Sequence, residues 1–599
     1  MIHRLINSLH RLSKSPYAQR LKDRSWVFGL VFLTQLLLSG YASYSSYNIG
    51  VTSLERVLSL IPYMIVHSGG WAVALLGIMA WPRKRIPSVL LGGLLLAIIV
   101  GFYMIEAVLL QEYHTLYNVD LALLLLSTST REAKESFSIL HASSFGWGIA
   151  GLLLASLGGY LIGRWIKRCH FYHVVWGALL LLIGGGGVIL PFAYQHLDSR
   201  VIPSSYTTSY ERAILSTTYG YLLSKKVEKR YAAMSRLEGL ESLTVESSPF
   251  DEPIDIVFVL GESTRRDYMH CYGYPLPNTP GIDSLLADSS LILFKDVTAP
   301  ATTTNYSCQR TLTYYTNGEG TKEWYDYPNL LGTLQRAGWA TAWVTNQETT
   351  GIYAASRIFS PFADVLRECH GGASGKLDTS EHALDDLGGA YDTSVLPLLQ
   401  TYSGLPDSLR QKKPRGLFEV VHLMGAHFDY AKRFPPSFAR FRPQDLPRKL
   451  DNKKGQVVAN YVNCVYFTDY VFTEIVKRYA HRPTLVFFLS DHGEILYDNP
   501  KEPNYYGHNP YMITPGAIEV PFLVYLSPSL KAKYPAVQKL FSRAKDLRIS
   551  ADLLTHTLTS FLGIRTRYTD PRLDFLSPGY DPQRKRMVTA TEAESFEVD

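Results

Sequence analysis

Hydropathy divides this chain of 599 residues into two unlike parts. Long uncharged runs fill it up to about residue 193, whereas the part after about Asp251 mixes apolar, polar and turn-forming residues as a globular domain does. A chain of this length is also too long for one core. We therefore expect a transmembrane domain at 1–200, an interfacial helix and linker at 201–252, and a globular domain at 253–599.

Five apolar runs approach the length of about 20 residues that a membrane-crossing helix needs. They cover residues 25–44, 60–81, 86–110, 143–165 and 172–193. Short basic segments lie before the first run, at 83–85 and at 164–168, and five spans would place all three on one side. Because short basic loops mark the cytoplasmic side, we expect a multi-pass protein of a bacterial inner membrane. Its N-terminus would be cytoplasmic and its globular domain periplasmic.

The segment that joins the two parts has its own pattern. Residues 206–234 mix apolar side chains with Lys225, Lys226 and Lys229, which is typical of a helix on a lipid surface. The polar run 238–252 then reads as a linker. The net charge of +6 is small for this length and gathers beside the apolar runs, so it gives no reason to expect nucleic acid as a partner.

Three β-branched runs in the globular part each end in chemically useful side chains. The runs at 254–260, 417–423 and 484–489 precede Glu262, His427 and the Asp491–His492 pair. Such runs predict buried parallel strands, with helices such as 462–479 between them. Since sites in open α/β sheets form at the carboxyl ends of strands, these side chains are expected at one edge.

Two carboxylates and an imidazole suit a divalent metal such as zinc, and manganese tolerates much the same ligands. A hydroxyl-rich segment, residues 296–307, offers Thr302, Thr303 and Thr304 as a fourth, oxygen ligand. A metal makes such a hydroxyl lose its proton more readily, which activates an otherwise poor nucleophile. Each residue alone also has a structural explanation, as part of a turn, a helix cap or a threonine-rich loop. Their coincidence favours a site.

The motifs that carry this chemistry also resemble those of a known family. They are Gly-Glu-Ser-Thr-Arg at 261–265, the threonine-rich segment, Met-Gly-Ala-His at 424–427, Ser-Asp-His-Gly-Glu at 490–494 and Tyr-Gly-His-Asn-Pro at 506–510. Over nearly the whole chain they resemble the phosphoethanolamine transferases of the alkaline phosphatase and sulfatase superfamily. The resemblance implies an N-terminal five-helix transmembrane domain followed by a C-terminal α/β alkaline-phosphatase/sulfatase-like periplasmic domain.

The resemblance also implies roles for individual residues. The resemblance implies one zinc ion, with a second possible. The zinc ligands would be Glu262, Thr304, Asp491 and His492. Thr304 would also be the residue that becomes phosphorylated. His427 and His508 would contact the phosphate or a second zinc, with His427 or His508 as a general acid. In the loop 128–135, Glu132 would lie near the ethanolamine ammonium, although Ser129 replaces the usual asparagine.

The implied reaction moves phosphoethanolamine from phosphatidylethanolamine to an envelope acceptor through a phosphothreonine. The acceptor would be the lipid A or core of lipopolysaccharide, or a periplasmic glucan. Members that modify lipid A and confer polymyxin resistance hold their nucleophile between cysteines, whereas here Ala299-Pro300-Ala301 precedes the threonines. This favours a cysteine-poor branch and leaves the acceptor open. A disulfide or two among Cys271, Cys308, Cys369 and Cys464 is compatible with the sequence, which does not say which cysteines pair.

Two other functions share parts of this pattern. A lipoteichoic-acid-synthase-like glycerol-phosphate transferase has the same five-span layout and a threonine nucleophile. A non-catalytic membrane scaffold would carry a degenerate enzyme domain. The match at 507–510 argues against the first, and retention of all proposed metal positions argues against the second. A formylglycine sulfatase is disfavoured, because Ser307-Cys308-Gln309-Arg310 lacks the required proline.

Overall fold

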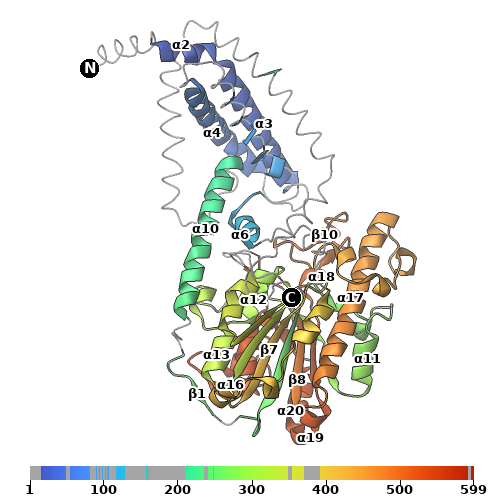
Figure 1. Ribbon diagram of the computed structural model, residues 1–599. Helices are drawn as coiled ribbons and strands as arrows, with labels where there is room; N and C mark the ends of the chain where they lie inside the picture. The colour runs from blue at the N-terminus through green and yellow to red at the C-terminus, as the bar shows by residue number, and fades with distance from the viewer. Residues whose placement is uncertain are drawn as a thin grey trace, which may run out of the picture. The chain divides into compact units, whose positions relative to one another are not determined.

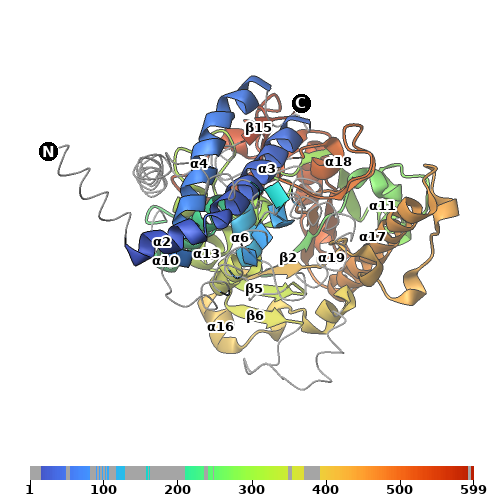
Figure 2. The same ribbon diagram turned by 90° about the horizontal axis from the view of Figure 1, so that it is seen from above.

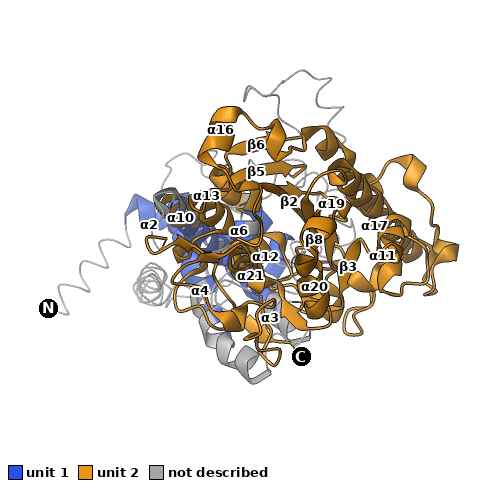
Figure 3. Cartoon of the chain, turned by 90° about the horizontal axis from the view of Figure 1, so that it is seen from below, with its two compact units in different colours: residues 1–125, 130–223 blue, residues 126–129, 224–599 orange. Residues whose placement is uncertain are grey.

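The computed structural model divides the chain into two compact units (Figure 3). Unit 1 comprises residues 1–125 and 130–223, and unit 2 comprises residues 126–129 and 224–599. Within them, the structure describes residues 15–48, 54–80, 116–127, 209–234, 240–246, 248–347, 354–369, 391–510, 512–590 and 595–598, with isolated positions at 90–109 and 157–161.

The described part of unit 1 is helical. Its helices are α2 (Pro16–Asp23), α3 (Trp26–Asn48), α4 (Leu54–Ala80) and α6 (Val119–Ser127). Helices α3 and α4 pack through a small apolar cluster that includes Val31, Leu75 and Leu76. They cover the first two predicted spans, and the last two predicted spans lie almost wholly outside the described residues. In the part of the chain that is described, no helix meets the length and hydropathy needed to cross a membrane. The number of spans stays a prediction.

The connecting segment begins as a long helix, as its pattern predicts. Helix α10 (Ser209–Met234) runs from unit 1 into unit 2. The following polar run is more ordered than a plain linker, because it contains the short strand β1 (Thr244–Val245), which pairs antiparallel with β13 (Ile564–Arg565). This pairing fixes the end of the segment to the globular unit.

A seven-stranded sheet forms the centre of unit 2, in the order β3-β11-β8-β2-β7-β5-β6. The strands are β3 (Leu291–Phe294), β11 (Phe522–Leu526), β8 (Thr484–Ser490), β2 (Ile254–Gly261), β7 (Gly416–His422), β5 (Ala340–Thr345) and β6 (Val365–Glu368). Strands β8, β2, β7, β5 and β6 are parallel, and β11 runs antiparallel to both its neighbours. The three strands predicted from the sequence are therefore confirmed as buried, adjacent and parallel.

Helices cover both faces of this sheet, with α11 and α17 on one side and α12 and α13 on the other (Figures 1 and 2). The helices of unit 2 are α11 (Pro280–Ala287), α12 (Thr304–Thr311), α13 (Leu330–Arg336), α14 (Ala355–Phe359), α16 (Asp407–Lys412), α17 (Asn452–Tyr479), α18 (Pro515–Ile518), α19 (Pro528–Lys533), α20 (Pro535–Ala544) and α21 (Leu554–Phe561). Three short pairs, β4 (Asp296–Thr298) with β12 (Arg548–Ser550), β9 (Ile495–Leu496) with β10 (Tyr506–Gly507), and β14 (Met587–Thr589) with β15 (Ser595–Glu597), lie outside the main sheet.

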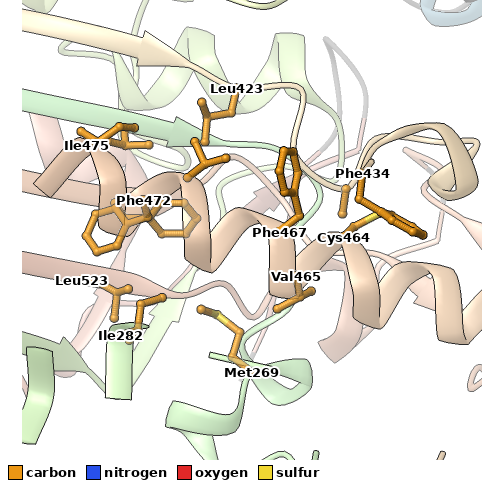
Figure 4. Close-up of a cluster of buried hydrophobic side chains, with 14 of the residues drawn as sticks. Met269, Ile282, Leu423, Phe434, Cys464, Val465, Phe467, Phe472, Ile475 and Leu523 are labelled. Carbon is orange, nitrogen blue, oxygen red and sulfur yellow. The ribbon is translucent and has the colours of Figure 1, made fainter. Parts of the chain in front are cut away.

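Helix α17 supplies much of the core against the sheet (Figure 4). Its start is fixed by the Asp451 carboxylate, which accepts hydrogen bonds from the backbone amides of Lys453 and Lys454. Buried side chains then recur at helical spacing, as at Val465, Phe472 and Ile475. The predicted helix at 462–479 is thus the C-terminal part of a longer helix that begins at Asn452.

The cysteines do not form the disulfides that the sequence allowed. Cys271, Cys308, Cys369 and Cys464 are free thiols. Cys308 and Cys464 are buried, and Cys464 belongs to the main apolar core, where a thiol packs as a small hydrophobic group. The fifth cysteine, Cys169, lies outside the described residues.

Candidate active site

Two neighbouring strand ends bring the acidic residues together. In the parallel register of β2 and β8, Gly261 stands opposite Ser490. Glu262 and Asp491 each follow one residue later, so they meet at the same edge of the sheet although more than two hundred residues separate them in sequence. On the other side of β2, strand β7 ends at His422 and leads into the Met424–His427 turn.

The three predicted metal ligands from these strands form one buried cluster. Ligand atoms of Glu262, Asp491 and His492 all lie within 4.8 Å of one another. His492 Nε2 lies 3.4 Å from Glu262 Oε1 and 3.4 Å from Asp491 Oδ2. Their side chains are almost fully excluded from solvent, so two carboxylates share a low-dielectric space. Such a space is costly without a compensating cation.

The hydrogen bonds around the cluster leave metal-binding atoms open. Asp491 Oδ1 accepts from the backbone amides of Ser263 (3.1 Å) and His492 (2.7 Å), whereas the buried Oδ2 has no hydrogen-bond partner among the described residues. His492 Nδ1 lies 2.7 Å from the Gly493 carbonyl oxygen. When Nδ1–H donates to that oxygen, Nε2 keeps its lone pair for a metal.

The buried carboxylates of the cluster favour a positive charge beside them. Burial alone would lower the pKa of His492, but Asp491 and Glu262 raise it to about 10. Burial and the neighbouring Glu262 carboxylate raise the pKa of Asp491. Both shifts draw a proton into the place where the donor atoms converge. The donor set of two carboxylates and one imidazole therefore fits a divalent cation, and zinc in particular.

Thr304 completes the cluster from a different element. It is the first residue of α12, and its Oγ1 donates to Glu262 Oε2 at 3.0 Å and lies 3.4 Å from His492 Nε2. Thr302, by contrast, donates to the carbonyl oxygen of Asn509 at 3.0 Å. Thr303 is the N-cap residue of α12. Of the three threonines that the sequence left open, Thr304 is the one whose hydroxyl contacts the acidic cluster.

Two further histidines border the cluster. The ring of His508 lies 4.3 Å from that of His492 and 6.3 Å from that of His427. His508 Nδ1 faces the buried carboxylate of Glu494 at 3.3 Å. Burial lowers the pKa of His427 to about 3, so its imidazole is neutral at physiological pH. Both predicted histidines are thus at the site, and Glu494 orients one of them.

Backbone conformation at the strand ends depends on particular residues. Gly425 has a φ of 49°, and a Cβ atom there would approach the carbonyl oxygen of Glu262 to 2.7 Å. Ser263 also adopts a left-handed conformation, with a φ of 54°, while its hydroxyl donates to Glu262 Oε1 at 2.7 Å. The Ser263 hydroxyl thus holds the Glu262 carboxylate, and the Gly425 turn lies close to the Glu262 backbone.

The sequence motifs missed one residue of the site, Gln347. It follows the end of β5, and its Nε2 donates to Glu262 Oε2 at 2.9 Å and to the carbonyl oxygen of Leu423 at 3.0 Å. A signal was present, since the strand-like run 340–345 is followed by polar Asn346 and Gln347, as the runs at 254–260 and 484–489 are soon followed by Glu262 and Asp491. The predicted substrate residue Glu132 lies outside the described residues.

Comparison with known proteins agrees with this architecture. Residues 254–564 match the family model described as Sulfatase. The chain belongs to the sulfatase family. Among curated relatives, phosphoethanolamine transferase EptC of Escherichia coli (strain K12) is 26% identical over 576 residues, which cover 93% of this chain and 90% of EptC. Phosphoethanolamine transferase CptA of Salmonella typhimurium is 30% identical over 55% of this chain and 54% of CptA.

Solved structures also match this fold. The C-terminal periplasmic domain of E. coli EptC, in a crystal structure in complex with Zn, matches 59% of this chain and 95% of that domain, with 26% identity and a TM-score of 0.51. The integral membrane protein EptA of Neisseria meningitidis shares the fold over 92% of this chain and 97% of its own, with 16% identity and a TM-score of 0.60. The predicted sulfatase-like domain and the resemblance to phosphoethanolamine transferases are confirmed.

Proposed function

We propose that the chain transfers phosphoethanolamine from phosphatidylethanolamine to a cell-envelope glycan or lipid through a phosphorylated Thr304. The observation that carries the proposal is the Thr304 hydroxyl, held 3.0 Å from Glu262 Oε2 beside the Asp491–His492 pair. This arrangement presents one hydroxyl to a buried cation-binding cluster, which is how a weak alcohol nucleophile is activated. The curated relatives named above support the choice of phosphoethanolamine as the transferred group.

Zinc is the proposed cofactor, held by Glu262, Asp491, His492 and Thr304. A bound zinc would act as a Lewis acid at this cluster, lowering the pKa of the threonine hydroxyl and neutralising charge on phosphoryl oxygens. The unpartnered Oδ2 of Asp491 and the open Nε2 of His492 support this ligand set. The EptC domain in complex with Zn supports the choice of metal. We propose one ion at this cluster and leave room for a second near His427 and His508.

In the first half of the reaction, Thr304 Oγ1 passes its proton to Glu262 Oε2, to which it donates a hydrogen bond in the resting site. A bond forms between Oγ1 and phosphorus, and the bond from phosphorus to the diacylglycerol oxygen breaks. His508, held at Nδ1 by Glu494, protonates the departing oxygen. His427 is kept neutral by its low pKa, which suits it better to orienting the phosphate. The N-terminal end of α12 adds a favourable dipole for the phosphoryl charge.

In the second half, a hydroxyl of the acceptor attacks the same phosphorus, the bond from phosphorus to Thr304 Oγ1 breaks, and Oγ1 takes back its proton from Glu262. The acceptor's proton goes to the histidine that protonated the first leaving group, which restores the resting site. We propose an envelope glycan or lipid as acceptor, because one relative is a Kdo(2)-lipid A phosphoethanolamine 7''-transferase from S. typhimurium. A lipid donor also explains an inner-membrane location with a periplasmic catalytic domain. Glu132 is proposed to meet the ethanolamine ammonium.

The deciding experiment incubates the purified chain with phosphatidylethanolamine and measures intact and peptide masses. We expect one phosphoethanolamine adduct on Thr304 and none in Thr304→Ala. Thr302→Ala is the matched control, since Thr302 neighbours the nucleophile but bonds to the carbonyl of Asn509. An adduct on another residue, or full transfer by Thr304→Ala, would overturn the mechanism.

A further inference from the structure

The turn that carries His427 leaves the sheet directly after β7. Strand β7 ends one residue before Leu423, whose backbone amide still donates to the carbonyl oxygen of Leu260 at 3.0 Å. The residues that follow, Met424–Phe428, form what we call the His427 turn. Because they lie outside the sheet, their buried amides and carbonyls need partners from other segments. Those partners decide where the His427 side chain lies.

Asp392 binds the amide side of the His427 turn. It is the first residue of the short helix η5 (Asp392–Leu398), and its side chain is buried. Its Oδ1 accepts a hydrogen bond from the backbone amide of Met424 and its Oδ2 accepts one from that of Gly425, each at 2.8 Å. A carboxylate suits this arrangement because both of its oxygens are acceptors, whereas an asparagine side chain has a single acceptor oxygen.

Arg433 binds the carbonyl side of the same turn. Its side chain is also buried. Its Nε lies 3.1 Å from the carbonyl oxygen of His427 and 3.1 Å from that of Phe428, and its Nη2 donates to the Phe428 oxygen at 2.6 Å. A planar guanidinium offers several donors in fixed directions, so it can hold two neighbouring carbonyls at once. Groups of opposite charge therefore hold the turn from its two sides.

The same hydrogen-bond network reaches Glu262 by two routes. Asp392 Oδ1 also accepts from Asn346 Nδ2 at 2.8 Å. The next residue in the chain, Gln347, donates to Glu262 Oε2. Within the His427 turn, the backbone amide of Ala426 donates to the carbonyl oxygen of Glu262 at 3.0 Å. Asp392 thus connects the segments after β5 and β7, both of which contact Glu262.

The two buried charges fix a conformation more than they stabilise the fold. Burial raises the pKa of Asp392, whereas its three hydrogen bonds and the nearby Arg433 lower it. Burying a charge costs free energy that hydrogen bonds and an opposite charge offset, and well-packed neutral groups often stabilise a fold as well. What the two charges add is a fixed backbone at a turn that borders the acidic cluster.

We propose that Asp392 and Arg433 are positioning residues for phosphoethanolamine transfer, which fix the His427 turn and so hold the His427 ring beside the acidic cluster. Both act through the turn and not on the substrate. Their role in transfer rests on the proposed function, in which His427 orients the phosphate, whereas the rigidity of the turn does not. A displacement of about 1 Å at such a group lowers a reaction rate by about 100-fold.

Hydrogen exchange of the full chain in detergent, followed by peptide mass spectrometry, tests the rigidity of the turn. Asp392→Asn keeps the size of the side chain but turns an NH2 group toward one of the two backbone amides. We expect peptides that cover the His427 turn to exchange about tenfold faster or more in this variant. Asp469→Asn is the matched control, because Asp469 is also buried and accepts from two consecutive amides, those of Gly281 and Ile282, at 2.9 and 2.7 Å. It should leave exchange in the His427 turn unchanged.

The rate of phosphoethanolamine adduct formation tests the role in transfer. We expect Asp392→Asn to lower this rate by about 10- to 100-fold. Arg433→Lys keeps the charge but loses the planar fork, so it should lower the rate less. Asp469→Asn should keep the rate of the unaltered chain per folded molecule. In a His427→Ala background, Asp392→Asn should lower the rate by a further twofold at most, roughly, because both changes remove the same contribution.

Three results would overturn the proposal. They are unchanged exchange of the His427 turn in Asp392→Asn, an equal loss of rate in Asp469→Asn, and a full effect of Asp392→Asn in the His427→Ala background. If Asp392→Asn does not fold, Arg433→Lys takes its place in the exchange measurement and in the combination with His427→Ala. A chain that forms no adduct, although its His427 turn loosens in Asp392→Asn, would instead overturn the proposed function and with it the role in transfer.

Discussion

Glu106 and Glu262 are both buried acids, one in each unit, and their surroundings differ in kind. Glu106 in unit 1 forms an ion pair with Arg212 of α10. Arg212 Nε lies 2.6 Å from Glu106 Oε1, and Arg212 Nη2 contacts Glu106 Oε2. Glu262 in unit 2 instead shares its space with a second carboxylate, Asp491. The chain supplies a fixed cation to the first site and leaves the second short of positive charge. That contrast separates an acid that is paired with a cation inside the fold from one that belongs to a candidate metal site.

The largest expected effect comes from Asp491→Asn, which removes one of the two clustered charges. We expect phosphoethanolamine transfer to fall by about a thousandfold or more, because several kcal/mol of transition-state stabilisation depend on the bound metal. Metal content by mass spectrometry should fall with it. The metal-free variant should unfold at the same temperature as the metal-free parent or higher, since a buried repulsion is relieved. A large loss of metal-free stability would contradict the comparison.

Unlike Asp491→Asn, Glu106→Gln should lower the stability of the fold. It leaves the Arg212 guanidinium buried beside a neutral amide, which costs about 3 kcal/mol or more of unfolding free energy. Thermal unfolding in detergent measures the loss. The double change Glu106→Leu with Arg212→Met should recover much of it. Glu246→Gln is the matched control, because the Glu246–Arg565 pair is exposed and contributes about 1 kcal/mol or less.

A smaller effect is expected from Gln347→Ala, which removes the amide that donates to both Glu262 Oε2 and the Leu423 carbonyl. Loss of such an orienting partner lowers metal affinity by about 10- to 100-fold. Competition with a zinc chelator measures this. Gln335→Ala, at the end of α13 and away from the cluster, should leave the affinity unchanged. Equal zinc affinities in the two variants would show that Glu262 does not need the hydrogen bond from Gln347 to bind the metal.

The smallest effect concerns Glu419, a third buried acid, in the middle of β7. Burial raises its pKa to about 8, while the Tyr479 hydroxyl and the Gln400 amide bond to it. The folded state thus binds a proton more tightly than the unfolded state. The contribution of Glu419 to the free energy of unfolding is full below the unfolded-state pKa and is lost as pH rises through about 8. The free energy of unfolding then falls by no more than about 1.4 kcal/mol per pH unit.

Thermal unfolding across that pH range tests this expectation. Glu419→Gln should flatten the decline in stability with rising pH, because the amide stays neutral throughout. Glu474→Gln, on the outer surface of α17, should leave the slope as it was. An unchanged slope in Glu419→Gln would mean that Glu419 is ionised in the folded protein.

Several central strands of unit 2 could be predicted from the local sequence pattern. The strands that became β2, β7 and β8 were predicted because a buried parallel strand needs a continuous apolar run, and the polar residues after each run marked the site. Gln347 was missed because the two residues that follow β5 are amides, which carry no chemistry by themselves. The linker strand β1 was missed because two residues give no periodic signal, and only pairing with β13 makes them a strand.

The sequence by itself determined the central parallel strands, and it predicted two unlike parts of the chain and the residues of the candidate site. Those features depend on hydropathy and residue type, which are local properties. Only the tertiary structure decided which threonine contacts the cluster, that four cysteines stay free, and that Tyr314 and Tyr568, far apart in sequence, stack on each other. The physical reason is that such contacts depend on how the chain returns upon itself, and no local pattern records the distance between two side chains.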